Sequence, residues 1–239
     1  MNKRMTQSLR RLFFRGALLA ALLLPQLAGA AQPVPAAGVD YIEIEGGAPW
    51  RPLAGKIEVV EVFAYWCHHC ADFQPKIDAW KKTLPASVRF NYVPLPNNAD
   101  DAFARAYFAA DAIGALGKTH NATFRAVHAE SSLPKNATAE EIATLYARLG
   151  VDMKQYKAAQ QGPGTGGQLQ KARDFALRSG LEGTPTLVIN GRYRVRGRTL
   201  DDNLRIASYL VAREDAALQQ AALQQAALKP AALKPAAKR

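Results

Sequence analysis

The chain has 239 residues and a formal net charge of +11 at pH 7. Most of that charge lies at the two ends, because the first 30 residues carry five cations, the last 24 carry four, and neither stretch contains an acid. The central 185 residues therefore keep a net charge of only +2, which argues against a nucleic-acid binder. This central length suffices for one domain with a sizeable core and an inserted subdomain.

Residues 1–30 are typical of a secretory signal peptide. A start rich in Lys and Arg precedes an apolar run over 17–24, and Ala28-Gly29-Ala30 supplies small residues, so we expect cleavage after Ala30. The alternative is a membrane anchor, but a span needs about 20 apolar residues and Pro25 ends the run. The mature protein is then expected in an oxidising compartment, the bacterial periplasm, and to begin with a flexible leader over 31–40.

The residues after this leader predict a strand, a second strand, a helix and a third strand. Alternating residues over 41–45 and a Val-rich run over 56–64 indicate two strands, the second of them buried. A helix is expected from Cys67 towards Leu84, followed by a strand over 87–95. A helix between two parallel strands makes a βαβ unit, which places the start of the helix at a strand-to-helix junction.

From residue 100 to residue 180 the pattern is helical. Thr138 and Glu141 predict a capping box at the start of one helix, and the stretch 162–167, which contains four glycines, is expected to interrupt the helices.

A hairpin and a last helix follow the helical block. Strands are expected over 186–189 and 193–196, joined by a type I′ turn at Asn190-Gly191, and Thr199 caps a helix through Leu210. Residues 216–239 repeat a five-residue unit, whose leucines would lie roughly 140° apart on a helix and so build no apolar face. We expect a mobile, low-complexity tail whose first ten residues can prolong the preceding helix.

The segment Cys67-His68-His69-Cys70 holds both cysteines of the chain. Two cysteines in the first turn of a helix lie close enough for a disulfide, but so short a ring stabilises the fold little, which favours a bond that is made and broken. A metal site is the alternative. Adjacent histidines on a helix point about 100° apart, so the four side chains do not readily converge on one ion. His120 and His128 are expected to be ordinary packing or surface residues.

Cys-x-x-Cys beside a βαβ unit is typical of a thioredoxin-like redox site. The aromatic run 63–66 leads into the pair, and Gly183-Thr184-Pro185-Thr186 precedes the hairpin, where a thioredoxin fold carries a cis-proline loop. Together these features resemble the DsbA family of periplasmic thiol:disulfide interchange proteins. The resemblance implies an α/β thioredoxin fold with an inserted helical subdomain. The expected boundaries are 41–96 and 180–215 for the thioredoxin-like domain, 97–179 for the insertion and 216–239 for the tail.

Several residues are expected to form the active site. Cys67 at the helix start is the nucleophile, because unpaired backbone N–H groups and the helix dipole favour a thiolate there, and His68 and His69 can add to this effect. Cys70, one turn deeper, is expected to be less exposed and to have the higher pKa. The family more often has proline at the position of His68, which leaves the redox potential open.

The resemblance also implies roles for residues outside this motif. Pro185 is expected to be cis, leaving the Thr184 backbone free to pair with an extended substrate. Glu61 occupies the position of a family glutamate under the active site and can relay a proton to Cys70, or else is a solvent-facing strand residue. Trp66 is the aromatic residue best placed to contact substrate.

The expected function is oxidation of cysteine pairs in newly exported, unfolded polypeptides, through an apolar and undemanding groove. The resemblance implies reoxidation by a membrane partner that passes electrons to quinone. We expect no cofactor beyond the redox-active disulfide, no bound metal, no nucleic acid and a monomer. The alternatives are a periplasmic isomerase or reductase, and a metal-binding chaperone on a thioredoxin scaffold.

Overall fold

The computed structural model of the chain describes residues 33–228. The predicted signal peptide and residues 229–239 of the tail lie outside this range, as do the first two residues of the leader. None of the helices in the described range is long and apolar enough to cross a membrane.

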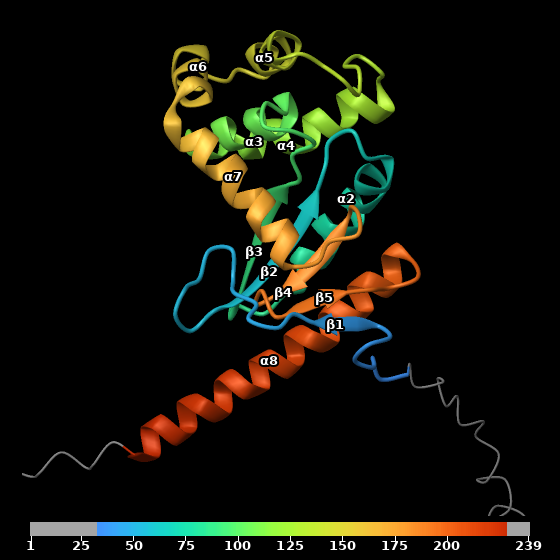
Figure 1. Cartoon of the computed structure of the whole chain (residues 1–239), viewed down its shortest axis with the longest axis vertical. Coiled ribbons are helices and arrows are strands. Elements are labelled where there is room, and N and C mark those ends of the chain that lie inside the picture. Colours follow the sequence, from blue (N-terminus) through green and yellow to red (C-terminus); the bar gives the residue numbers. More distant parts are fainter. Residues whose placement is uncertain (1–32, 229–239) are drawn as a thin grey trace, which may run out of the picture. The chain divides into compact units, whose positions relative to one another are not determined.

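Five strands form one mixed sheet. They are β1 (Tyr41–Glu43), β2 (Ile57–Phe63), β3 (Val88–Pro94), β4 (Thr186–Ile189) and β5 (Tyr193–Val195). Their order in the sheet is β1-β5-β4-β2-β3, and only β2 and β3 run parallel (Figure 1). The inner strand β2 is buried along its whole length, as its run of Ile, Val and Phe predicts, whereas the edge strand β3 is partly exposed.

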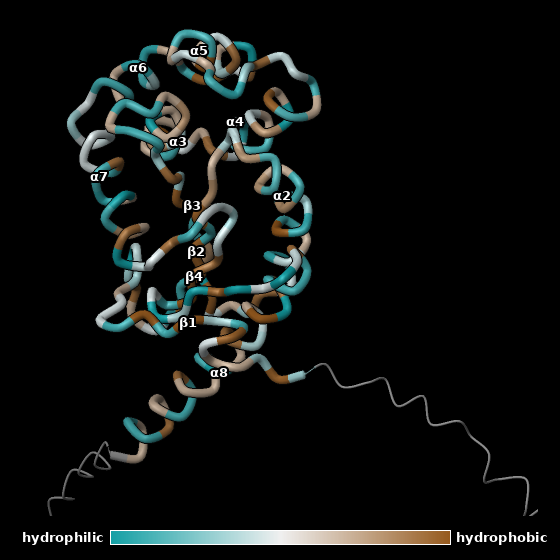
Figure 2. The backbone as a smooth tube through the Cα atoms, turned by 45° about the vertical axis from the view of Figure 1, so that its right-hand side comes forward, coloured by the Kyte–Doolittle hydropathy of each residue, from teal (hydrophilic) through white to brown (hydrophobic). Residues whose placement is uncertain are grey.

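Helices pack on both faces of this sheet (Figure 1). The helices are α2 (His68–Lys81), α3 (Ala102–Ala112), α4 (Leu116–Phe124), the π-helix η1 (Arg125–Ala129), α5 (Ala139–Arg148), α6 (Met153–Gln161), α7 (Pro163–Arg178) and α8 (Leu200–Leu228). On one face α2 and α8 pack Phe73, Ile77 and Leu210 against the strands. On the other face α3 and α7 contribute Phe103 and Phe175 to a second hydrophobic cluster. The strands between them are rich in hydrophobic residues (Figure 2).

The predicted order of elements is confirmed, and so is the hairpin turn, since Asn190 and Gly191 both have positive φ, at 51° and 63°. Two details differ. Residues 163–167 belong to α7 instead of interrupting the helices, and the helix begins with Pro163 at its first position, where a missing N–H costs nothing. The helix α8 continues through the repeats to Leu228, beyond the ten residues of the tail expected to prolong it, so this part of the tail is helical. The boundaries of the inserted subdomain stay a prediction.

The capping box at the start of α5 is present as the sequence predicts. The Thr138 hydroxyl accepts a hydrogen bond from the Glu141 N–H, and the Glu141 carboxylate accepts one from the Thr138 N–H. Thr138→Ala is therefore expected to lower the free energy of unfolding by about 1 kcal/mol in denaturant titrations. Thr144→Ala, on the exposed surface of the same helix, is the matched control. A loss as large in the control would contradict a capping effect.

The topology brings the two predicted parts of the active site to one end of the sheet. β2 ends at Phe63, four residues before Cys67, and α2 starts directly after that cysteine. β4 runs antiparallel to β2 and pairs Thr186 with Val62, so the Thr184-Pro185 segment before β4 also lies at this end. Segments more than 110 residues apart in the sequence thus meet around Cys67.

Candidate active site

The two cysteines occupy the first turn of α2. Cys67 is the N-cap residue and is 8% exposed, whereas Cys70 is fully buried. Both are free thiols in the structure. The backbone N–H groups at this helix start have no partner within the helix, so they face the Cys67 sulfur and favour negative charge there.

The surroundings of Cys67 strongly favour its thiolate. Its pKa is lowered from 9.0 to about 5, chiefly because the Cys70 thiol hydrogen-bonds to its sulfur. Burial opposes the shift, while hydrogen bonds from the Thr184 side chain and from the backbone N–H groups of Cys70 and His69 add to it. Cys67 is therefore ionised at neutral pH and is the nucleophile of the pair.

Cys70 has the opposite environment. Burial raises its pKa far above the usual range of a thiol, the hydrogen bond with Cys67 raises it further, and so does the charge of Glu61. At neutral pH Cys70 is a protonated thiol that donates to its neighbour. The dithiol form thus holds its negative charge on the more exposed sulfur, where another molecule can reach it.

The loop before β4 closes the site from the other side. The Thr184–Pro185 peptide bond is cis, as the sequence predicts. The Cys67 thiol donates a hydrogen bond to the Thr184 carbonyl oxygen, with a sulfur-to-oxygen distance of 3.3 Å. This hydrogen bond exists only while Cys67 is protonated, so the Thr184 carbonyl is released once Cys67 is ionised.

The two histidines between the cysteines are exposed, and their ring centroids lie 3.8 Å apart. The causes that lower the pKa of Cys67 include the backbone of His69 but neither imidazole ring. Trp66 is partly buried against the hydrophobic cluster that contains Cys67. The described residues contain no group of three or more His, Cys, Asp or Glu side chains placed to hold a metal ion.

A thioredoxin family model matches residues 53–207, more than half of the chain. The thiol:disulfide interchange protein DsbA of Pseudomonas aeruginosa is 36% identical over 185 residues, which cover 76% of this chain and 86% of that protein. This chain belongs to the DsbA family. It is accordingly a thiol:disulfide oxidoreductase, an activity that suits a nucleophilic Cys67 beside a protonated Cys70.

Solved structures of DsbA proteins have the same fold. The DsbA of Xylella fastidiosa is 46% identical and superposes with a TM-score of 0.74, covering 77% of this chain and all of that one. The DsbA of Pseudomonas aeruginosa superposes with a TM-score of 0.70 at 35% identity, covering 77% of this chain and 97% of that one. The predicted thioredoxin fold is therefore confirmed.

Glu61 lies under the active site of this DsbA family member and is fully buried in β2. Neither carboxyl oxygen has a hydrogen-bond partner among the described residues. Burial raises the pKa of Glu61 well above its usual value, with Lys81 opposing the shift and Asp78 and Cys67 adding to it. The alternative of a solvent-facing strand residue is wrong, because the carboxyl is buried and lies within electrostatic reach of Cys70.

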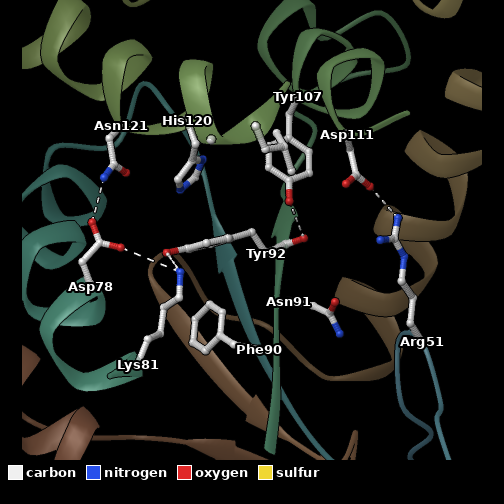
Figure 3. A pocket seen from close by; sticks show the side chains of 12 residues that line it. Arg51, Asp78, Lys81, Phe90, Asn91, Tyr92, Tyr107, Asp111, His120 and Asn121 are labelled. Carbon is white, nitrogen blue, oxygen red and sulfur yellow. Dashed lines mark hydrogen bonds and ion pairs between the residues drawn. The ribbon is translucent and has the colours of Figure 1, made fainter. Parts of the chain in front are cut away.

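A polar pocket of about 360 Å³ lies beside Tyr92, the strand neighbour of Glu61 (Figure 3). In this pocket the Lys81 ammonium contacts both the Tyr92 hydroxyl and the Asp78 carboxylate (Figure 3). The Tyr92 hydroxyl in turn accepts a hydrogen bond from Gln74. Charged side chains of this pocket therefore lie next to Tyr92, which is the neighbour of the buried acid in the sheet.

His120 and His128 support the loop that leads into the cysteines. The His120 ring accepts from the Tyr65 hydroxyl and donates to Gln74, and burial lowers its pKa to about 3, so the ring is neutral. His128 donates to the Tyr65 carbonyl oxygen over 2.7 Å. Sequence reasoning placed both residues among ordinary packing or surface histidines, and no local pattern connects either of them with residue 65.

Replacing Glu61 by leucine is expected to stabilise the oxidised protein by about 1–3 kcal/mol at pH 8, because it removes a buried carboxyl without a partner. The pKa of Glu61 is raised in the folded state. Its pH-dependent cost in stability is therefore absent below the unfolded pKa of 4.5 and grows as the pH rises above that value. Urea titrations of both proteins at pH 4.5 and pH 8 measure the difference. A gain of equal size at both values would contradict the raised pKa.

Proposed function

We propose that this enzyme is a dithiol oxidase, which donates its Cys67–Cys70 disulfide to newly exported polypeptides that contain reduced cysteines. The lowered pKa of Cys67 carries this proposal. A stable thiolate stabilises the reduced enzyme, and an enzyme that is stable when reduced has an oxidising disulfide. The predicted signal peptide supports a periplasmic location for the reaction.

The size of this effect follows from the two pKa values. At pH 7 a thiol with a pKa of about 5 is stabilised relative to one at 9.0 by about 2.7 kcal/mol of ionisation free energy. For a two-electron couple this corresponds to about 60 mV in the oxidising direction. An effect of this size moves the couple towards the potential of an oxidase and away from that of a reductase.

In the reaction a client thiolate attacks the Cys67 sulfur of the enzyme disulfide, and Cys70 leaves as a thiolate. Because the pKa of Cys70 is strongly raised, this thiolate takes up a proton at once, and Glu61 is the buried acid that can supply it. A second client thiolate then attacks the client sulfur of the mixed disulfide and releases the Cys67 thiolate. The client gains a disulfide, and the enzyme gains two electrons.

The loop at Thr184-Pro185 is the proposed docking edge for the client chain. With Cys67 in a disulfide or ionised, it has no proton to donate to the Thr184 carbonyl, which is then open to an extended client backbone. Reoxidation by a quinone-linked membrane partner would complete the cycle, and the reaction needs no cofactor beyond the disulfide.

Equilibration with glutathione buffers tests the proposal against the isomerase and reductase alternatives. We expect a reduction potential more positive than about −180 mV, the value typical of a disulfide isomerase. The same buffers with Cys67→Ser, which cannot form the disulfide, give the baseline. A potential near about −270 mV, as in a reducing thioredoxin, would overturn the oxidase assignment.

A further inference from the structure

A second pocket, of about 380 Å³, is lined by the Thr184-Pro185 loop. Its walls include Glu182, Arg194 and Arg196 together with the two loop residues. The sequence predicts an apolar and undemanding groove for the client chain. Beside Pro185, however, the surface is polar and carries charged side chains.

This pocket lies at the same end of the sheet as the nucleophile. Thr184, one of its walls, accepts the hydrogen bond of Cys67. The backbone N–H of Arg196 continues the sheet beyond β5 by donating to the Asp40 carbonyl oxygen, at the level where β4 begins. A residue of an extended chain advances by about 3.3 Å, so residues two or three positions from a client cysteine at Cys67 reach this pocket.

The charges of the pocket are unbalanced. Arg194 is 9% exposed; its Nη1 donates to Glu182, but its Nε is buried without a hydrogen-bond partner among the described residues. Arg196 is exposed, and its guanidinium forms no hydrogen bond or ion pair within the described part of the chain. Two guanidinium groups thus face one carboxylate, and that carboxylate is itself 68% exposed. The pKa of Glu182 is lowered by its hydrogen bond from Arg194 and by the nearby positive charges.

We propose that this pocket binds an acidic side chain of the client, so that the enzyme prefers cysteines flanked within a few residues by Asp or Glu. The inference deepens the proposed oxidase function and rests on it. A carboxylate can accept two parallel hydrogen bonds from a guanidinium, and the guanidinium of Arg196 is available to donate them. The enzyme's own Glu182 competes with a client carboxylate, because it already accepts a hydrogen bond from Arg194.

Three reduced two-cysteine peptides test the preference. They are identical except for Glu, Gln or Lys two residues from the first cysteine. The measured quantity is the second-order rate constant for reduction of the oxidised enzyme, in which two peptide thiols become a disulfide and the enzyme disulfide becomes two thiols. Because a nearby charge changes the reactivity of the peptide thiol, each rate is divided by that of the same peptide with neutral 2-hydroxyethyl disulfide.

After this correction we expect the Glu peptide to react about three to ten times faster than the Lys peptide at low ionic strength, with a ratio close to one in 1 M salt. Equal corrected rates at low salt would overturn the proposal. The two assignments fail differently. If no peptide reduces the enzyme, the oxidase function fails, whereas if all three do so at the same corrected rate, only the acidic pocket fails.

Single substitutions then locate the effect. Arg196→Glu is expected to abolish or invert the Glu-to-Lys ratio, and Glu182→Gln to increase it, because the competing carboxylate is gone. Arg198→Glu is the matched control, since Arg198 is an exposed arginine two residues further along that does not line the pocket. The ratio cancels any change in the potential of the enzyme. A control that alters the ratio as much as Arg196→Glu would overturn the assignment to this pocket.

Discussion

Replacing Cys70 by serine is expected to stop turnover and to leave client proteins attached to Cys67. In the variant, the Cys67 thiolate still attacks a client disulfide, forming a Cys67–client bond and releasing the other client sulfur as a thiol. In the wild type the Cys70 thiol reverses this step, but serine cannot. The adducts are measured by non-reducing electrophoresis of periplasmic extracts, followed by release with dithiothreitol.

The double variant Cys67→Ser, Cys70→Ser is the control, because it has the same fold and no thiol. We expect adducts with many exported proteins for the single variant and none for the double variant. If the single variant is folded and abundant yet carries no adducts, the enzyme does not exchange disulfides with exported clients. Adducts in equal amounts on both variants would show that they do not pass through Cys67.

The fold followed from the sequence wherever local pattern and tertiary packing agree. The strand β2 is a buried apolar run, and the turn at Asn190-Gly191 needs two positive φ angles. Thr138 and Glu141 hydrogen-bond the unpaired N–H groups at the start of α5. Residues 163–167 show where the agreement fails. Glycine is a poor helix former, but α7 buries Thr165 and Leu169 against the core, and that packing outweighs the local preference.

The site was predictable only for residues that share a motif or a known spacing. Cys67 and Cys70 were recognised from the Cys-x-x-Cys motif alone. The resemblance to the DsbA family located Glu61, Thr184 and Pro185. His120 was not predictable, because it meets Tyr65 across 55 positions through a contact that only the folded chain creates. The backbone contribution to the low Cys67 pKa was predicted from the helix start, but the largest cause, the hydrogen bond from the Cys70 thiol, was missed, and the histidine rings are not among the causes.

The stability of the reduced enzyme is expected to rise with pH between about 5 and 9, relative to that of the oxidised enzyme. The pKa of Cys67 is depressed in the folded state, so its thiolate contributes fully above the unfolded pKa of 9.0 and nothing below the folded pKa of about 5. Between these limits the slope is about 1.4 kcal/mol per pH unit, which amounts to about 2.7 kcal/mol at pH 7. Urea titrations of both redox forms, with dithiothreitol for the reduced one, measure this difference.

Taking the difference between the redox forms isolates Cys67 from the other buried groups. Glu61 has a raised pKa and destabilises the fold as the pH rises above 4.5, which is the opposite sign, but this residue is present in both forms and largely cancels. Repeating the titrations in Glu61→Gln removes what remains of the coupling between the two groups. Cys67→Ser forms no disulfide, so its stability is compared with that of the oxidised wild type, and this difference must lack the rising slope because a hydroxyl does not ionise in this range. A slope that survives this substitution would place the stabilising charge elsewhere and remove the physical basis for an oxidising disulfide.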